Sequence, residues 1–156
     1  MIIRNVRSTD YPPIISVLDE WWGGRKMSDM LPRLFFEHFC ETSFILEEDH
    51  QIAAFLIGFF SQSRPEEAYI HFVGVHPQYR KRGFGRELYK HLFTVMRQNQ
   101  RSVVRCVTSP VNTGSIAFHT RMGFRIEPGD AQSDGIAYHT DHDGPGEHRV
   151  CFVRQV

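Results

Sequence analysis

The spacing of apolar residues changes several times along the chain, and each change predicts a new secondary-structure element. Residues 2–7 are strand-like and would form a short opening strand. The polar residues 8–10 can cap a helix that the prolines 12–13 would start and the glycines 23–24 would end. Apolar residues at helical spacing then predict a second helix over residues 28–40.

A run of strands follows this helical region. Residues 43–47 and 52–60 are strand-like, and the polar residues 48–51 between them predict a hairpin turn. Residues 68–75 are rich in β-branched and aromatic side chains, and Pro77 stops this third strand because proline cannot donate to a ladder.

The period then becomes helical again. Phe84, Leu88 and Leu92 recur every fourth residue and predict an amphipathic helix. We expect the remaining elements to be a strand at residues 102–107, a helix at 112–122 ended by Gly123, a strand at 124–127, a polar loop and a last strand at 149–153.

The predicted order is β-α-α-β-β-β-α-β-α-β-β, which indicates a mixed α/β sheet with helices packed on it. The chain has 156 residues and no low-complexity linker or repeat, so we expect one domain over residues 1–156.

The charge balance excludes some classes of function. Eighteen basic residues oppose eighteen acidic ones, whereas a general binder of nucleic acid or of membrane surfaces would need a basic excess. The longest apolar run, residues 52–60, is too short for a membrane span, which needs about 20 residues. No secretory signal is visible at the start. We therefore expect a soluble, cytoplasmic protein with no nucleic-acid or membrane partner.

Cys40, Cys106 and Cys151 are widely spaced and form no C-x-x-C pair. This pattern is typical of buried thiols in a reducing compartment rather than of a disulfide framework.

A basic, glycine-containing loop begins the amphipathic helix. Gly83 and Gly85 allow a tight turn and close approach of a ligand to the backbone, and the unpaired N–H groups of the first helical turn would point at one spot. Together with the helix dipole and the cations Arg80, Lys81, Arg82 and Arg86, they predict an anion site suited to a pyrophosphate. Alone, the loop is equally compatible with a solvated helix start. It lacks the further residues of a Walker A loop or a dinucleotide fingerprint.

Two motifs together resemble the GNAT superfamily of N-acetyltransferases. Arg80-x-x-Gly83-x-Gly85, after a strand ending in Val-x-Pro, is similar to the family's Q/R-x-x-G-x-G/A motif. Further on, the segment from Asn112 to Phe124 is similar to its second motif, an N-x-x-A/S helix that closes on a Gly-Phe pair. The resemblance covers essentially the whole chain and is strongest over residues 68–124.

This resemblance implies acetyl-CoA as the co-substrate and a wedge between splayed central strands, here residues 68–75 and 102–107. Main-chain groups of Val73 and Val75 would pair with the pantetheine arm, and a main-chain N–H near Phe72 or Val73 would stabilise the oxyanion. The backbone of the loop that contains Phe84 would hold the pyrophosphate. From the following helix, Asn112 and Ser115 would face the arm.

The proton route follows less directly from the resemblance. The family usually has a tyrosine as general acid where this chain has His119, and histidine can serve as the acid or be structural. His71 is the candidate base, because strand alternation would put it on the same face as Tyr69 and Val73. The alternative is a packed His71 with proton loss through water. Glu41 and Glu67 are more remote candidates.

The acceptor is expected to be a primary amine of a small molecule or peptide, and a homodimer is compatible with the family. One of Trp21 and Trp22 is expected in the core and the other in the acceptor pocket. The histidine-rich segment 139–148 matches no zinc motif, so we expect a polar loop bordering the acceptor cleft and no metal. The alternative function is a non-catalytic acyl-CoA-binding or sensing module, which the absence of tyrosine at position 119 keeps open.

Overall fold

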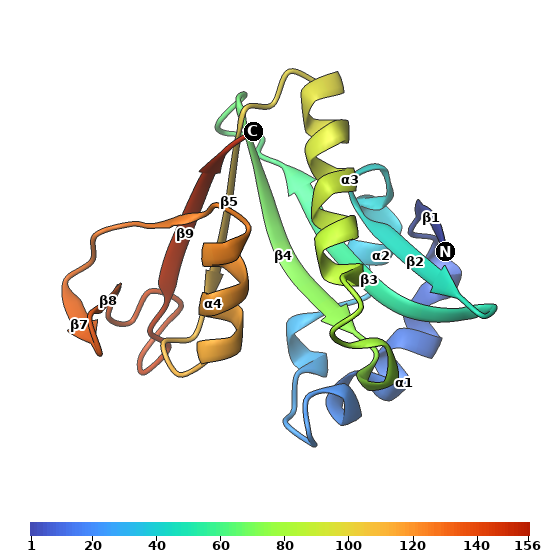
Figure 1. The fold of residues 1–156 in the computed structure, drawn as a ribbon, viewed down its shortest axis with the longest axis horizontal. Helices are drawn as coiled ribbons and strands as arrows, with labels where there is room; N and C mark the ends of the chain where they lie inside the picture. The colour runs from blue at the N-terminus through green and yellow to red at the C-terminus, as the bar shows by residue number, and fades with distance from the viewer.

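The computed structural model describes residues 1–156 and contains a seven-stranded sheet in the order β1-β2-β3-β4-β5-β9-β6 (Figure 1). Its neighbouring strands are antiparallel except for β4 and β5, which run parallel. A separate two-stranded ribbon pairs β7 with β8. The elements are β1 (Ile2–Asn5), α1 (Tyr11–Trp21), α2 (Leu34–His38), β2 (Phe44–Glu48), β3 (Gln51–Phe60), β4 (Glu67–Val75), α3 (Phe84–Gln98), β5 (Val103–Thr108), α4 (Thr113–Arg121), β6 (Arg125–Ile126), β7 (Ala131–Ser133), β8 (Ile136–Tyr138) and β9 (Val150–Gln155).

The sheet is split between β4 and β5. Their ladder contains only three residue pairs, which end at Tyr69 opposite Arg105, although β4 continues to Val75 and β5 to Thr108. Figure 1 shows the two strands close together at one end and diverging toward the other. The expected splayed α/β sheet is therefore confirmed.

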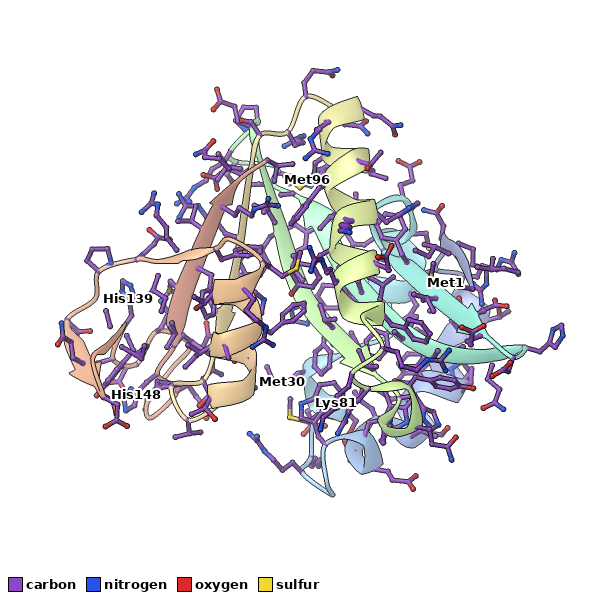
Figure 2. All side chains as sticks on the ribbon, in the orientation of Figure 1. Met1, Met30, Lys81, Met96, His139 and His148 are labelled. Atoms are coloured by element: carbon purple, nitrogen blue, oxygen red, sulfur yellow. The ribbon has the colours of Figure 1, made fainter.

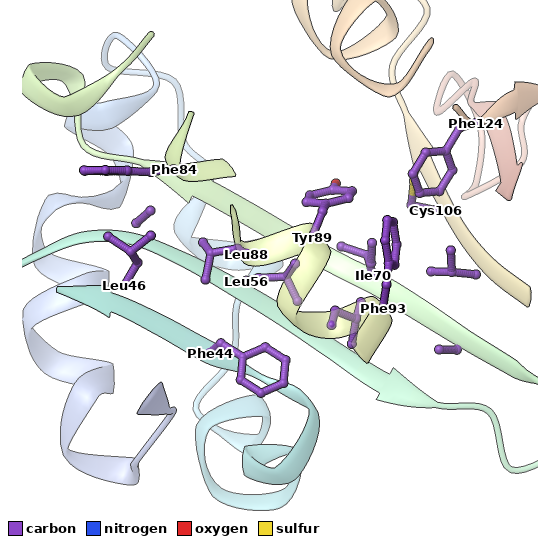
Figure 3. Packing of buried hydrophobic residues seen from close by; sticks show 14 of the residues in the cluster. Phe44, Leu46, Leu56, Ile70, Phe84, Leu88, Tyr89, Phe93, Cys106 and Phe124 are labelled. Carbon is purple, nitrogen blue, oxygen red and sulfur yellow. The ribbon is translucent and has the colours of Figure 1, made fainter. Parts of the chain in front are cut away.

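Each face of the sheet carries its own apolar cluster. On one face, α3 buries Leu88, Tyr89 and Leu92 against β2, β3 and β4 (Figure 3). The spacing of these residues explains why this helix is amphipathic. On the other face, α1 and the segment around α2 cover β3 and β4, and Leu18 and Phe36 are completely buried there. The helices thus cover both faces of the sheet, and beyond Tyr69 and Arg105 the strands β4 and β5 no longer pair with each other.

The second predicted helix is wrong as one continuous element. Residues 28–40 instead form the 3₁₀ turn Ser28–Met30, the five-residue α2 and the start of a second 3₁₀ turn, Cys40–Thr42. Pro32 explains the first break, because the residue before a proline is disfavoured in the helical region. Leu31 accordingly has φ −131° and ψ 67°.

The polar segment after β6 is also more ordered than expected, since it contains the β7–β8 hairpin. At the β2–β3 hairpin the expected turn is confirmed but tighter, with Asp49 and His50 both at positive φ. Gly23 and Gly123 end α1 and α4 at positive φ, as predicted. None of the helices combines the length and the apolar character that crossing a bilayer would require.

Candidate active site

The outer edge of β4 is open where β5 has diverged. His76 N donates to the carbonyl of Ala53, the residue directly opposite, over 2.8 Å. Because an antiparallel pair alternates between bonded and non-bonded residues, Gly74 points its polar groups at β3, whereas Val73 and Val75 point theirs at the open edge. The carbonyl of Val75 already accepts from Arg80 Nε at 3.3 Å. Main-chain groups of the predicted pair Val73 and Val75 thus face the wedge.

The loop before α3 contains a run of unpaired amides. The first backbone bond of this helix runs from Glu87 N to Gly83 O, 3.0 Å, and none of the amides of residues 80–86 has an acceptor in the chain. Gly83 precedes the helix in the left-handed region, with φ 81° and ψ 12°, and Lys81 also has a positive φ of 64°. This backbone shape exposes consecutive N–H groups, and the positive end of the 15-residue helix dipole adds to their attraction for an anion.

The four cations of this loop have different roles. Arg80 donates to the carbonyl of Trp21 and so ties the loop to the end of α1. Arg82 turns back toward Glu48 at 3.4 Å and lies over the Phe84 ring, 4.9 Å from its centroid. The side chains of Lys81 and Arg86 are the exposed cations of the loop without a partner in the chain, so they remain available to an anion (Figure 2 labels Lys81).

A β-bulge changes the expected faces of β4. Phe72 opposes Ile57 and Ile70 opposes Gly58, so His71 is an extra residue without a partner on β3. As a result, Val73 packs against the cluster under α3, whereas His71 stacks on Phe35 of α2 with ring centroids 4.2 Å apart. The prediction that His71 and Val73 share a face is therefore wrong, because simple alternation does not hold through a bulge.

His71 is held in one orientation. Its Nε2 atom lies 2.6 Å from the carbonyl oxygen of Met30, and since a carbonyl only accepts, Nε2 must carry the proton. The neutral ring then has its lone pair on Nδ1, which has no hydrogen-bond partner in the chain. Burial lowers the pKa of His71 below its usual 6.5, against the opposing effect of the bond to Met30. Near neutral pH this side chain is therefore an uncharged ring with one available acceptor nitrogen.

His119 has a different environment, because both of its nitrogens are engaged. Nδ1 lies 2.8 Å from the carbonyl of Ser115 and Nε2 lies 2.8 Å from the hydroxyl of Tyr89. The carbonyl requires a proton on Nδ1, so Nε2 accepts from Tyr89. The ring is buried, stacks on Phe152 at 4.7 Å, and burial lowers its pKa. Only the Ser115 hydroxyl, 3.2 Å from Nδ1, connects this ring to a less buried position.

The start of α4 faces the end of α1. Asn112 caps the helix, since its side-chain oxygen accepts from Ser115 N at 3.1 Å. A cleft of 390 Å³ lies between this helix start, Arg80 and the Trp21–Arg25 end of α1. Trp21 is 5% exposed and belongs to the core, while Trp22 is half-buried with its ring edge-on to Phe72 at 5.1 Å.

A second cavity, of 520 Å³, lies at the other side of the wedge. Tyr69 and Glu67 line it from β4, and Glu67 pairs with Arg105 of β5 at 3.1 Å. Arg105 also pairs with Glu127. Burial raises the pKa of Tyr69 to about 12, so its hydroxyl stays protonated. His139 and His142 border the same cavity.

Sequence reasoning missed Tyr89, Met30 and Arg105. In the sequence, Tyr89 cannot be told apart from the apolar residues of α3, because His119, which its hydroxyl contacts, is 30 residues away. Met30 acts through a main-chain carbonyl, which any residue supplies. Arg105 lies in β5, where the alternation of side chains between the two faces could have indicated that it points away from the core.

Comparison with known proteins agrees with this geometry. The sequence profile of the acetyltransferase (GNAT) family matches residues 4–124. A search of curated protein sequences finds no significant match.

Solved structures of similar fold cover nearly the whole chain. A protein from Desulfovibrio desulfuricans described as a GNAT-family acetyltransferase superposes with a TM-score of 0.80 at 18% identity, over 99% of this chain and 98% of its own. The ribosomal-protein-S18-alanine N-acetyltransferase of Escherichia coli gives 0.70 at 18% identity, over 99% and 93%. A Salmonella typhimurium protein solved with acetyl-CoA gives 0.71 at 19% identity, also over 99% and 93%. At these identities the structures establish a shared fold.

Proposed function

The chain belongs to the GNAT family of acetyltransferases, and on that premise we propose that it transfers the acetyl group of acetyl-CoA to a primary amine of a small molecule or peptide. The observation that carries the proposal is the combination of an open β4 edge with the run of unpaired amides at residues 80–86. An extended polar arm that ends in a pyrophosphate matches both features at once.

The cofactor would bind along one continuous path. The amides of residues 80–86 would receive the pyrophosphate, with Lys81 and Arg86 supplying charge. The pantetheine would then pair with Val73 and Val75 in place of a neighbouring strand. The side-chain oxygen of Asn112 already accepts the hydrogen bond that caps α4. Its side-chain nitrogen and the Ser115 hydroxyl are therefore the groups at this helix start that could bind the pantetheine arm.

The chemistry would take place beside the bulge. A neutral amine nitrogen attacks the thioester carbonyl carbon, the new C–N bond forms, and the C–S bond breaks as the tetrahedral intermediate collapses. The N–H of Val73, which alternation directs into the wedge, is suited to stabilise the oxyanion. His71 Nδ1 is suited to take the proton of the incoming ammonium, because its lone pair is available and its neighbour Val73 donates to the oxyanion.

The leaving thiolate must take up a proton to complete the reaction. His119 is poorly arranged to supply it directly, since its proton is committed to the Ser115 carbonyl and its other nitrogen to Tyr89. We therefore assign His119 a positioning role for α4, and the thiolate is protonated from solvent or through the Ser115 hydroxyl. Coenzyme A is a good leaving group, so this route suffices.

The acceptor would approach through the 520 Å³ cavity, on the side of the wedge that Tyr69 and Glu67 line. Trp22 stands at the opposite cleft, near the end of α1, and is the tryptophan left for contact with bound ligands. Glu67 and Glu127 provide carboxylates that can attract a cationic amine, although both already pair with Arg105.

The test is to incubate the protein with acetyl-CoA and a panel of amines, including amino acids, polyamines and peptides with free N-termini, and to follow thiol release. We expect amine-dependent release for at least one class of acceptor. Acetyl-CoA binding measured by calorimetry without turnover on any amine would instead favour the alternative, a non-catalytic acyl-CoA sensor. Absence of CoA binding would contradict both.

A further inference from the structure

Three side chains from two distant parts of the chain converge beside the 520 Å³ cavity. One ligand atom from each of His139, His142 and Cys151 lies within 4.8 Å of the other two. We propose that these three residues bind a zinc ion. Nothing in the family assignment or in the transfer of an acetyl group requires this site, so its test does not depend on the proposed function.

The fold brings the three residues together through backbone pairing. His139 follows β8 and forms an isolated bridge with Arg149, with main-chain bonds of 2.8 and 3.1 Å in the two directions. Cys151 lies two residues beyond Arg149 in β9, where it pairs with Val107 of β5. His142 sits in the loop between the two halves of this bridge, and Figure 2 shows His139 and His148 on the same side of the molecule as this loop.

The loop that carries His142 is held in place by polar contacts. Arg149 binds Asp143 at 2.8 Å and Glu147 at 3.1 Å. Asp141 accepts from Gly146 N at 2.8 Å, closing the turn from the other side. The site is therefore built before any ion arrives, which lowers the ordering entropy that binding would otherwise cost.

The chemistry of the donors fits zinc. Imidazole nitrogen and thiolate sulfur are both preferred ligands of Zn²⁺, and catalytic zinc sites keep three protein ligands and one open position. In a tetrahedral zinc site the donor atoms lie roughly 3.5 Å apart, given ligand distances of about 2.0–2.3 Å. The three donor atoms already lie within 4.8 Å of one another, so shifts of at most about 1.3 Å would bring them to that spacing. Thiolate excludes Mg²⁺ and Ca²⁺, which prefer oxygen ligands.

One atom of the cluster lacks any other explanation. Nε2 of His139 is buried and has no hydrogen-bond partner, and a buried polar atom without a partner destabilises the folded chain. A metal bound through Nε2 would remove this penalty. All three ligands also line the cavity that contains Tyr69 and Glu67, so a fourth position would open toward the proposed acceptor space rather than into the core.

The test uses untagged full-length protein, stripped of metal with a chelator, and titrated with Zn²⁺ by calorimetry and with Co²⁺ by absorption. The informative variants are His142→Ala, which removes an exposed side chain, and Cys151→Ser. His38→Ala and Cys40→Ser are matched controls with the same residue types outside the cluster. Circular dichroism of each apo-protein checks that it folds.

We expect one Zn²⁺ per chain and a thiolate-to-cobalt charge-transfer band. The affinity should fall by more than about 100-fold in both cluster variants, since even the outer partners of metal ligands contribute 10–100-fold. Both controls should bind as the parent protein does. No stoichiometric binding, or equal binding by a folded His142→Ala variant, would overturn the proposal.

Discussion

Nε2 of His71, at the bulge of β4, lies 2.6 Å from the main-chain carbonyl oxygen of Met30, in the 3₁₀ turn Ser28–Met30. This bond decides which nitrogen of His71 carries the proton and leaves Nδ1 as an acceptor. The bulge directs the ring away from the face of Val73 and against Phe35. A local irregularity in one strand and a carbonyl in a short turn thus create the candidate base together.

His71→Gln should lower kcat by about 10²–10⁴ if His71 is the general base, because the amide of glutamine can still donate to Met30 but has no basic nitrogen. The parent activity should rise with pH through a value below 6.5 and then level off, because burial lowers the pKa of His71. In the variant this rise should disappear for the same acceptor. Steady-state rates between pH 5 and 8 measure both effects. The control is His38→Ala, which changes an exposed histidine of α2. An unchanged dependence of the rate on pH in the glutamine variant would show that His71 is not the general base.

Arg80→Ala should raise the KM for acetyl-CoA by about three- to tenfold with little change in kcat. Its side chain ties the loop to the carbonyl of Trp21 and to that of Val75, and charged hydrogen bonds of this kind contribute about 1.5–3 kcal/mol when they are not screened by water. Initial rates at varied acetyl-CoA test this. Lys26→Ala removes the same charge near α1 but outside the loop. Equal effects in both variants would indicate a general charge effect and not a positioned loop.

Tyr89→Phe should lower the free energy of unfolding by about 1–3 kcal/mol, because it leaves Nε2 of the buried His119 without its donor. Activity per folded molecule should change much less, since neither group is expected to contact substrate. Denaturant unfolding measures the first quantity. Tyr138→Phe is the comparison, because the hydroxyl of Tyr138 has no bond within the chain and its loss should be nearly neutral. A large loss of turnover in stable Tyr89→Phe protein would instead support a proton relay through His119.

Stability should also fall as the pH drops below 6.5. Burial lowers the pKa values of His71, His91 and His119 in the folded chain. The unfolded chain therefore binds protons that the folded chain does not, so the stabilisation is present above pH 6.5 and is lost as the pH falls toward the folded values. The slope is at most about 1.4 kcal/mol per pH unit for each histidine. Urea unfolding at pH 7.5 and 5.5 measures it, and His119→Gln should flatten the dependence. A stability that rises on acidification would contradict these assignments.

Much of the fold was predictable because local patterns and tertiary structure agree. The four-residue period from Phe84 to Leu92 and the glycine at the end of α4 each appear in the structure as the sequence predicts. The strand order did not follow from the pattern. It depends on pairings such as that of β5 with β9, whose partners lie from 42 residues apart, at Thr108 and Val150, to 52 residues apart, at Val103 and Gln155. No local signal encodes such a pairing.

The site was predictable only in part, for a physical reason. The loop proposed to bind the pyrophosphate is a local feature, so Gly83 and its neighbours indicate it in the sequence. The direction of His71 depends on an extra residue in β4, and the bulge follows from pairing with β3 rather than from composition. Likewise, the proximity of Cys151 to His139 and His142 arises from the bridge to Arg149, so the histidine spacing alone could not indicate it.

The most direct test of the account is a titration of ¹⁵N-labelled protein with coenzyme A, followed amide by amide. We predict the largest shifts at the amides of residues 80–86, together with Val73 and Val75, because these groups lack partners or face the open edge of β4. Shifts confined to other surfaces, such as the basic cleft of Arg97, Arg121 and Arg154, with the loop amides unchanged, would contradict it.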